Sequence, residues 1–251
     1  MAAPTFRREV FAEFARIGRA LAHEHRLEIL DLLAQAPRNV EAIASETRLP
    51  VASVSQHLQV LRRARLVETE REGTHVRYCI ADFAVLELCR AVTRVAERRL
   101  LEVPAIFSRW MIDGVPGERV AQADAVRLLA AGDITLIDVR PPLEYSSGHL
   151  PGALSVPLDE IEEHIDSLPR DRPIVTYCRG QYCLSADEAV AYLRARGFNA
   201  MRVEGGWTEW LNEQRWPGHG GLGALSDVEQ RTGTGSGARR HVQDQARSIR
   251  S

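Results

Sequence analysis

The chain has 251 residues, of which 45% are hydrophobic, and this length and composition suit one or two domains with cores of their own. It has neither an apolar run of about 18 residues nor a basic-then-apolar N-terminus, so we expect no membrane span and predict a cytoplasmic protein. Four cysteines without a C-x-x-C pair exclude a disulfide framework, and the net charge of −2 is too small to indicate a binding partner by itself.

The first predicted element is a helix over residues 6–21. Its apolar residues recur every three or four positions and therefore share one face, and they are Phe6, Val10, Phe11, Phe14, Ile17 and Leu21. A long apolar face at the start of the chain suits contact with a second copy in a homodimer. Burial in the chain's own core is the alternative, and the periodicity does not separate the two.

Three shorter helices are predicted next, over residues 27–33, 40–46 and 51–63, and Asn39 stands where it can cap the middle one. This arrangement is typical of a helix-turn-helix, whose second helix enters the DNA major groove. That helix presents short polar side chains on its outer face: Ser53, Ser55, Gln56, His57 and Gln59. We predict that they contact DNA bases or phosphates, and an ordinary solvated face is the alternative.

Two alternating strands over residues 66–80 are predicted to form a hairpin that turns at Glu72-Gly73. Arg71, His75 and Arg77 cluster around its tip, and cations at this position can pair with DNA phosphates. A hairpin that follows a recognition helix is typical of a wing.

With these motifs in place, residues 8 to 100 resemble the ArsR family of winged-helix repressors. The matching segments are Leu21-Ala22, Arg26-Leu27-Glu28-Ile29-Leu30, the run from Ser53 to Leu61, Leu66-Val67, Glu72-Gly73 and Tyr78. The resemblance implies a homodimer that binds a double-stranded DNA operator and represses transcription until a sensor site is occupied.

A further long helix is predicted over residues 82–101, and in the resembled family this helix pairs with the first one across the dimer. Many relatives bind metals there or on the short helix before the turn. In this chain residues 40–46 have no cysteine, and residues 82–101 have no histidine–carboxylate pattern. Cys79 and Cys89 stand singly rather than at a zinc-site spacing. We therefore predict no metal and no cofactor, and we expect Cys89 to be a core residue.

A second domain is predicted after a linker over residues 104–117. It contains a buried strand over residues 174–177 that runs through a loop into a helix from Ser185 onward. Cys178 is the first residue of that loop, where backbone N–H groups and the helix dipole converge. Such a position stabilises a thiolate, so we predict that Cys178 is a nucleophile or redox group. The alternative is a small hydrophobic residue at a strand end.

Flanking motifs favour the functional interpretation, and with them residues 118 to 217 resemble the rhodanese family. The matching segments are Asp138-Val139-Arg140, Glu144-Tyr145, His149, Pro151-Gly152-Ala153, Gly205-Gly206-Trp207 and Trp210. The resemblance implies an α/β domain with a parallel sheet, in which Cys178 accepts a sulfane sulfur as a persulfide. Asp138 and Arg140 are expected to hold the loop and helix ends. The candidate catalytic residues are those of the loop: Cys178, Arg179, Gly180, Gln181, Tyr182 and Cys183.

The loop departs from the family pattern, because it is one residue longer than is usual in the family's sulfurtransferases. A longer loop makes a wider cradle, and in relatives that act on phosphate or arsenate it accompanies the larger tetrahedral anion. Cys183 near its end could attack a modified Cys178 as a resolving cysteine. It could equally pack under the loop without any reaction, and both alternatives stay open.

The expected fold class is an α+β winged helix-turn-helix domain followed by an α/β rhodanese-like domain with a parallel sheet. Residues 1–103 form the DNA-binding and dimerisation domain, 104–117 the linker, 118–218 the rhodanese-like domain and 219–251 a polar tail expected to be disordered. One predicted function is a repressor that senses sulfane sulfur, an oxidant or an oxyanion through Cys178. The other is a sulfurtransferase or oxyanion reductase that is tethered to DNA.

Overall fold

The computed structural model describes residues 3–73, 75–110 and 119–213. The tail predicted over residues 219–251 and the linker residues 111–117 lie outside this range. Among the described helices, none combines the length and the apolar character that crossing a bilayer requires.

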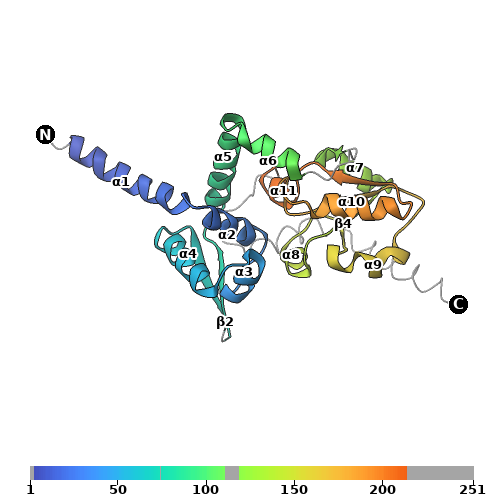
Figure 1. Cartoon of the computed structure of the whole chain (residues 1–251), viewed down its shortest axis with the longest axis horizontal. Coiled ribbons are helices and arrows are strands. Elements are labelled where there is room, and N and C mark those ends of the chain that lie inside the picture. The colour runs from blue at the N-terminus through green and yellow to red at the C-terminus, as the bar shows by residue number, and fades with distance from the viewer. Residues whose placement is uncertain (1–2, 74, 111–118, 214–251) are drawn as a thin grey trace. The chain divides into compact units, whose positions relative to one another are not determined.

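The N-terminal domain consists of helices and one antiparallel hairpin, and Figure 1 shows the hairpin extending beyond α3 and α4. Its elements are α1 (Ala3–Leu21), α2 (Glu24–Gln35), α3 (Val40–Thr47), α4 (Val51–Arg63), β1 (Val67–Glu72), β2 (His75–Ile80), α5 (Phe83–Arg99) and α6 (Glu102–Trp110). The predicted helix-turn-helix and wing are confirmed. Helix α6 occupies the start of the segment predicted as a linker, because apolar residues at helical spacing continue through Ile106 and Trp110.

Side-chain caps determine where two of these helices begin. Asn39 Oδ1 accepts a hydrogen bond of 2.8 Å from the backbone N–H of Ala42, so the predicted cap of α3 is confirmed. Asp82 Oδ1 caps α5 in the same way, at 2.7 Å from the N–H of Ala84. Arg48 follows α3 with a left-handed φ of 55°, which ends the helix and starts the turn into α4.

Helix α4 is amphipathic, as its sequence predicts. Val54, Leu58 and Leu61 are completely buried in the core of the N-terminal domain. The polar residues between them therefore lie on the opposite side of the helix, where a recognition helix presents its contacts.

Helix α1 buries only its C-terminal end in that core, through Ala20 and Leu21. Phe6, Phe11 and Phe14 are 69%, 55% and 63% exposed. Intrachain burial, one of the two alternatives for the apolar face of residues 6–21, is therefore wrong for most of its length.

The C-terminal domain is built on a five-stranded parallel sheet with the order β3-β7-β6-β4-β5, which confirms the predicted parallel sheet. The strands are β3 (Arg119–Val120), β4 (Thr135–Asp138), β5 (Leu154–Ser155), β6 (Ile174–Tyr177) and β7 (Ala200–Val203). The helices are α7 (Gln122–Ala131), α8 (Pro142–Ser147), α9 (Ile161–His164), α10 (Ser185–Ala195) and α11 (Trp207–Glu213), with short 3₁₀ turns at Leu158–Glu160 and Ile165–Ser167. Strand β6 is buried over its whole length, as is usual for the central strand of a parallel sheet.

Parallel strands bring the separated sequence motifs to one edge of this sheet. Asp138, at the end of β4, pairs in register with Tyr177, at the end of β6. Cys178 follows β6 directly, and Gly205-Gly206 follows β7. Since the carboxyl ends of parallel strands share an edge, these three motifs form a single region of the molecule.

Candidate functional site

The start of α11 holds the cysteine loop, which we define as residues 178–184. The N–H of Trp207 donates to the carbonyl of Cys178, and the N–H of Thr208 donates to the carbonyl of Arg179, both at 3.1 Å. Gly206 has no space for a side chain, because a Cβ there would lie 2.7 Å from the backbone nitrogen of Gly180. The Gly-Gly-Trp motif therefore fixes the loop through close backbone contact.

The Cys178 side chain points into the core of the domain. Its exposed fraction is 0%, and it packs with apolar neighbours such as Ile137 and Ala186. Its thiol donates to the carbonyl oxygen of Cys183 at 3.2 Å. Burial raises the pKa of Cys178 well above its ordinary value, although the N–H of Ala186 acts in the other direction. The prediction of an amide-stabilised thiolate at this position therefore differs from the structure, because the side chain continues the buried pattern of β6.

Cys183, rather than Cys178, has the surroundings that favour a thiolate. Its side chain is half-buried and lies near groups that favour its thiolate, namely Cys178, Ser185 and the N–H of Arg179. Cys178 has the largest influence, and together these neighbours lower the pKa of Cys183 to about 5 despite its burial. At neutral pH the lowered pKa of Cys183 favours its thiolate, and the raised pKa of Cys178 favours its thiol.

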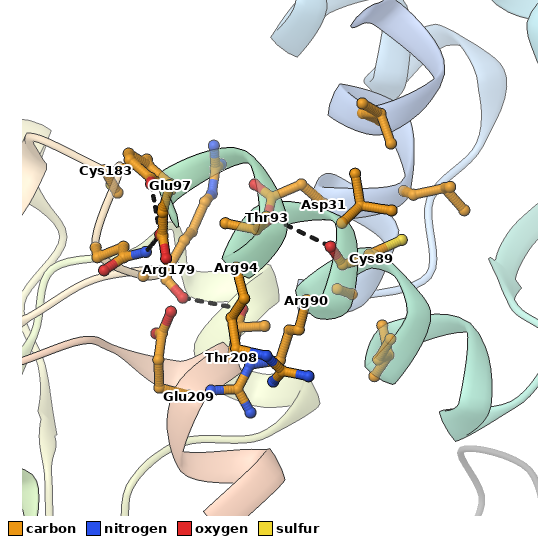
Figure 2. Close-up of a pocket in the computed structure, with 18 residues that line it drawn as sticks. Asp31, Cys89, Arg90, Thr93, Arg94, Glu97, Arg179, Cys183, Thr208 and Glu209 are labelled. Atoms are coloured by element: carbon orange, nitrogen blue, oxygen red, sulfur yellow. Dashed lines mark hydrogen bonds between the residues drawn. The ribbon is translucent and has the colours of Figure 1, made fainter. Parts of the chain in front are cut away.

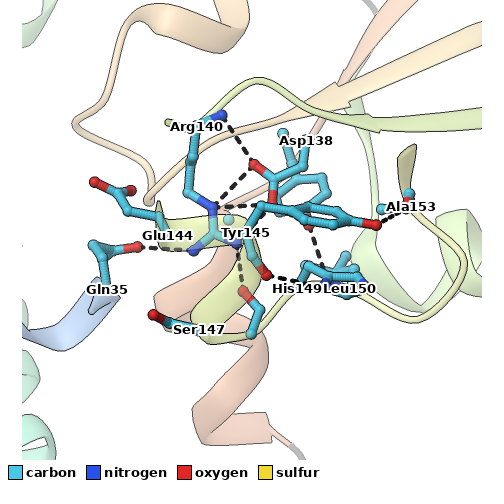
Figure 3. A network of polar contacts seen from close by, with 12 residues as sticks. Gln35, Asp138, Arg140, Glu144, Tyr145, Ser147, His149, Leu150 and Ala153 are labelled. Carbon is cyan, nitrogen blue, oxygen red and sulfur yellow. Dashed lines mark hydrogen bonds and ion pairs between the residues drawn. The ribbon is translucent and has the colours of Figure 1, made fainter. Parts of the chain in front are cut away.

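Asp138 and Arg140 form a buried ion pair at the shared sheet edge, with 2.6 Å between Arg140 Nη2 and Asp138 Oδ2. Tyr177 donates its hydroxyl to Asp138 at 2.6 Å, and Arg140 also donates to the carbonyl of Gly148 at 2.7 Å. Figure 3 shows this guanidinium between Asp138 and Gln35 of α2. The pair joins β4, β6 and the turn after α8, so its geometry suits the predicted supporting role.

Glu144 is a fully buried carboxylate that two arginines share. Arg179 of the cysteine loop donates to it from Nε at 2.9 Å and from Nη2 at 2.6 Å, and Arg38 of the N-terminal domain donates from its own Nη2. Arg179 Nη2 also lies 2.9 Å from Glu46 Oε2 on α3. A single network of charges thus connects the cysteine loop with the helix-turn-helix.

Two further contacts extend the connection between the domains. Gln35 of α2 donates to the hydroxyl of Thr208 at 2.8 Å, and that hydroxyl donates to the carbonyl of Arg179. The backbone of Arg38 pairs with Tyr78 of the wing, with N–H to carbonyl distances of 3.0 and 2.7 Å. The network that begins at the cysteine loop therefore reaches both α3 and the wing.

The predicted DNA-contact residues of α4 have different surroundings. Gln56 and Gln59 are exposed, whereas Ser53 and Ser55 are half-buried. His57 is half-buried too, and its ring lies 4.5 Å from that of His23, between ring centroids. Burial, and then the neighbouring His23, lower the pKa of His57, which favours its neutral form.

The predicted wing cations also differ from one another. Arg71 is exposed, as a phosphate contact requires. Arg77 is half-buried and donates to the carbonyl of Pro37 at 2.9 Å, so it supports the turn before α3. The side chain of His75 lies outside the described part of the structure.

Two family models match this chain. The bacterial regulatory protein arsR family matches residues 23–69, and the rhodanese-like domain matches residues 121–213. The HTH-type transcriptional regulator Rv0324 of Mycobacterium tuberculosis is 42% identical over 198 residues, which make up 79% of this chain and 87% of that relative. The chain belongs to the ArsR family of transcriptional regulators. Its C-terminal domain is a rhodanese-like domain.

Other relatives match one domain each. A sulfurtransferase of Allochromatium vinosum is 32% identical over 101 residues, or 40% of this chain and 89% of the relative. A solved structure, described as the homodimeric winged helix-turn-helix DNA-binding domain of Mb0332 from Mycobacterium bovis, is 44% identical. It covers 38% of this chain and 88% of its own, with a TM-score of 0.36.

In this ArsR-family regulator a cavity of about 470 Å³ opens between the cysteine loop and helices α2 and α5 (Figure 2). Cys183 lines it, and Cys178 does not. The carboxyl group of Asp31 faces the cavity, and the surrounding protein raises its pKa to about 6. Burial also raises the pKa of Glu209, which lines the opposite side on α11.

Sequence reasoning missed the residues that join the two domains. Gln35, Arg38 and Glu46 have no motif that singles them out, because each is an ordinary polar residue of a helix or turn. Glu144 belongs to a recognised motif, but its partners lie in the other domain. A buried charge must find a partner, yet the sequence does not show that it is buried.

Proposed function

We propose that this ArsR-family regulator binds a double-stranded DNA operator as a homodimer and changes its affinity when the cysteine loop reacts with a small sulfur compound. The reaction is uptake of a sulfane sulfur or oxidation, at Cys178 and Cys183. One observation carries the proposal: Arg179 of the cysteine loop binds Glu46 on α3, so the loop that holds both cysteines is tied to the helix-turn-helix.

The homodimer is supported by the unburied aromatic residues of α1. Phe6, Phe11 and Phe14 lie on one face, and each is more than half exposed in the single chain. Exposed apolar surface of this extent usually marks an interaction site. A second copy of α1 is the partner that the resemblance to the ArsR family implies.

Reaction at the loop would alter the contact with α3 through electrostatics. The thiolate of Cys183 is a charged acceptor, and hydrogen bonds to charged acceptors are stronger than those to neutral ones. A persulfide or a disulfide removes this charge from the Cys183 sulfur, so the loop backbone around Arg179 loses an electrostatic attraction. The ion pair between Arg179 and Glu46 then weakens, and α3 supports α4 in the helix-turn-helix. The two loop states would thus favour different arrangements of the DNA-binding helices.

The test is a titration of the regulator with labelled DNA from its own promoter, before and after treatment with sodium polysulfide. We expect the Kd of the wild type to change by about tenfold, because that corresponds to a coupling energy of typical size. Cys178→Ala and Cys183→Ala should bind DNA without this response. Cys79→Ala is the matched control and should respond normally, because Cys79 lies outside the cavity beside the loop and burial raises its pKa to about 11, which keeps its thiol protonated.

Peroxide and arsenate, applied in separate titrations, distinguish sulfur chemistry from oxidation and oxyanion binding. An unchanged Kd in the wild type, after mass spectrometry has shown sulfur on the loop, would contradict the proposal.

Catalytic sulfur transfer is a second candidate function. It is supported by the likeness of the rhodanese-like domain to the sulfurtransferase of Allochromatium vinosum and by a thiolate that faces a cavity. A thiol that accepts sulfur can pass it to another acceptor. Repeated formation of thiocyanate from thiosulfate and cyanide would demonstrate turnover, whereas a single equivalent per chain would identify a sensor.

A further inference from the structure

We propose that the sulfur donor is an organic persulfide with amino-acid-like charged groups, that it binds in the cavity beside α5, and that Cys183 rather than Cys178 receives its sulfur. This inference rests on the proposed function and specifies its entry thiol and its substrate class.

The two sulfur atoms differ in their access to the cavity, which indicates the cysteine that reacts first. Cys183 lines the cavity, whereas Cys178 is completely buried behind it. A reagent in the cavity therefore meets Cys183 first. The pKa values agree with this order, since Cys183 is lowered to about 5 and Cys178 is raised well above its ordinary value. The thiolate is the form that attacks.

The size of the cavity indicates an organic donor. Its volume of about 470 Å³ is within the range of sites that hold organic ligands. An inorganic donor such as hydrogen disulfide has only two heavy atoms and would fill a small part of that volume. Apolar side chains also line the cavity, among them Leu27 and Leu30 of α2 and Val92 of α5. They suit the carbon skeleton of a larger molecule.

Charged groups around the cavity indicate which groups the donor carries. Arg90 and Arg94 stand one helical turn apart on α5, so they share a face, and both line the cavity (Figure 2). Within the described residues neither guanidinium forms a hydrogen bond or a close ion pair, although Arg90 lies near enough to Glu209 to affect its pKa. These two cations suit a carboxylate on the donor.

The opposite charge is present as well. Glu209 has a buried Oε2 atom without a hydrogen-bond partner within the described part of the chain, and the exposed Asp31 lines the same cavity. A buried acceptor without a donor is costly, so Glu209 suits an ammonium or amide N–H of the ligand, and Asp31 adds a second carboxyl group for it. Carboxylate and N–H groups together are typical of an amino acid or a short peptide.

The chemistry is balanced in two steps. The thiolate of Cys183 attacks the terminal sulfur of the donor R–S–SH; the S–S bond of the donor breaks, and R–S⁻ leaves, so Cys183 becomes a persulfide. The sulfur of Cys178 then attacks the inner sulfur of that persulfide, and a Cys178–Cys183 disulfide forms. Hydrosulfide leaves and takes the proton of Cys178 as H₂S. The two thiols are oxidised, and the transferred sulfane sulfur is reduced.

The experiment follows uptake from cysteine persulfide and, separately, from inorganic hydrogen disulfide. Rapid quenching with an alkylating agent and peptide mapping identify the first cysteine that gains a sulfur atom. We expect Cys183 in the wild type, which requires no substitution, and a persulfide that persists on Cys183 in Cys178→Ala. First labelling of Cys178 would overturn the inference.

Selectivity is tested with Arg90→Gln/Arg94→Gln. Uptake from cysteine persulfide should slow by about tenfold, whereas uptake from hydrogen disulfide should change by less than about twofold, because only the former has a carboxylate to lose. Arg98→Gln/Arg99→Gln, on the exposed end of the same helix, is the control and should behave as the wild type. Equal slowing of both donors would contradict a carboxylate site.

The outcomes also separate this inference from the function on which it rests. If polysulfide changes operator affinity but sulfur enters at Cys178, only the inference is wrong. If neither cysteine of the loop gains sulfur from any donor, both are wrong.

Discussion

Cys178 and Cys183 differ in their chemistry because of their surroundings, since the two residues are of the same type and belong to one loop. Cys178 has lost its hydration to apolar neighbours and keeps its proton. Cys183 lies near Cys178, Ser185 and the N–H of Arg179, which lower its pKa to about 5, so it loses its proton at neutral pH. The buried thiol thereby helps to stabilise the reactive one.

This difference predicts the pH dependence of alkylation. The rate at which iodoacetamide modifies Cys183 should follow its thiolate fraction, so the rate should be constant at neutral pH and fall as the pH drops through about 5. In Cys178→Ala the largest influence that lowers the pKa of Cys183 is lost, so the pH midpoint of its alkylation should rise toward the ordinary thiol pKa of about 9. Peptide mapping after short labelling measures both.

Cys79 and Cys89 are internal controls for that experiment, because burial raises the pKa of each to about 11. They should react slowly across the neutral range. If alkylation of wild-type Cys183 had its pH midpoint near the pKa of an ordinary thiol, the neighbours of Cys183 in the loop would not stabilise its thiolate, and this account of the loop would be wrong.

The sequence could predict where the loop lies but not how its side chains point. A strand, a cysteine and a helix start locate an anion cradle, and the flanking motifs identify its family. Which cysteine faces that cradle depends on the path of a few backbone bonds after Tyr177. No periodicity or spacing indicates that path, so the sequence pattern predicts for Cys178 the surroundings that Cys183 has.

At the scale of elements, local physical rules account for most of the fold. Apolar spacing predicted α1, α4 and α5, and the cap at Asn39 placed the start of α3 correctly. The sequence could not decide whether α1 packs within the chain, because an apolar face does not identify its partner. The structure decides it through the exposure of the aromatic residues.

Helix α1 leads to a prediction about assembly. In Phe11→Ser/Phe14→Ser the dimer should dissociate, with a Kd at least about a hundredfold higher, because burial of one phenylalanine contributes about 2 kcal/mol. Sedimentation analysis measures the change, and circular dichroism should be unaltered since both rings are exposed in the single chain.

Arg8→Ser is the matched control for α1. Arg8 is exposed and lies away from the aromatic face, so this variant should remain dimeric. A dimer that is equally stable in the double variant would place the interface elsewhere.

For the molecule as a whole, the contacts between the two domains determine how sulfur chemistry can influence DNA binding. Glu144 joins Arg38 and Arg179, and Arg179 continues to Glu46. A buried carboxylate that loses one of its partners is strongly destabilised, so such a network favours a few discrete arrangements. The two pairs that cross between the domains, Arg38–Glu144 and Arg179–Glu46, are each more than 100 residues apart in the sequence. The motifs of either domain alone therefore could not predict them.

The most direct test of this account is the operator affinity of Glu46→Gln, measured with and without polysulfide. Glu46 contacts neither sulfur atom, so the variant should take up sulfur at the wild-type rate, but its Kd for DNA should no longer respond. Glu41→Gln, exposed on the same helix, should respond as the wild type does. If Glu46→Gln takes up sulfur and its Kd still changes by the full wild-type factor of about ten, the link through Arg179 does not exist.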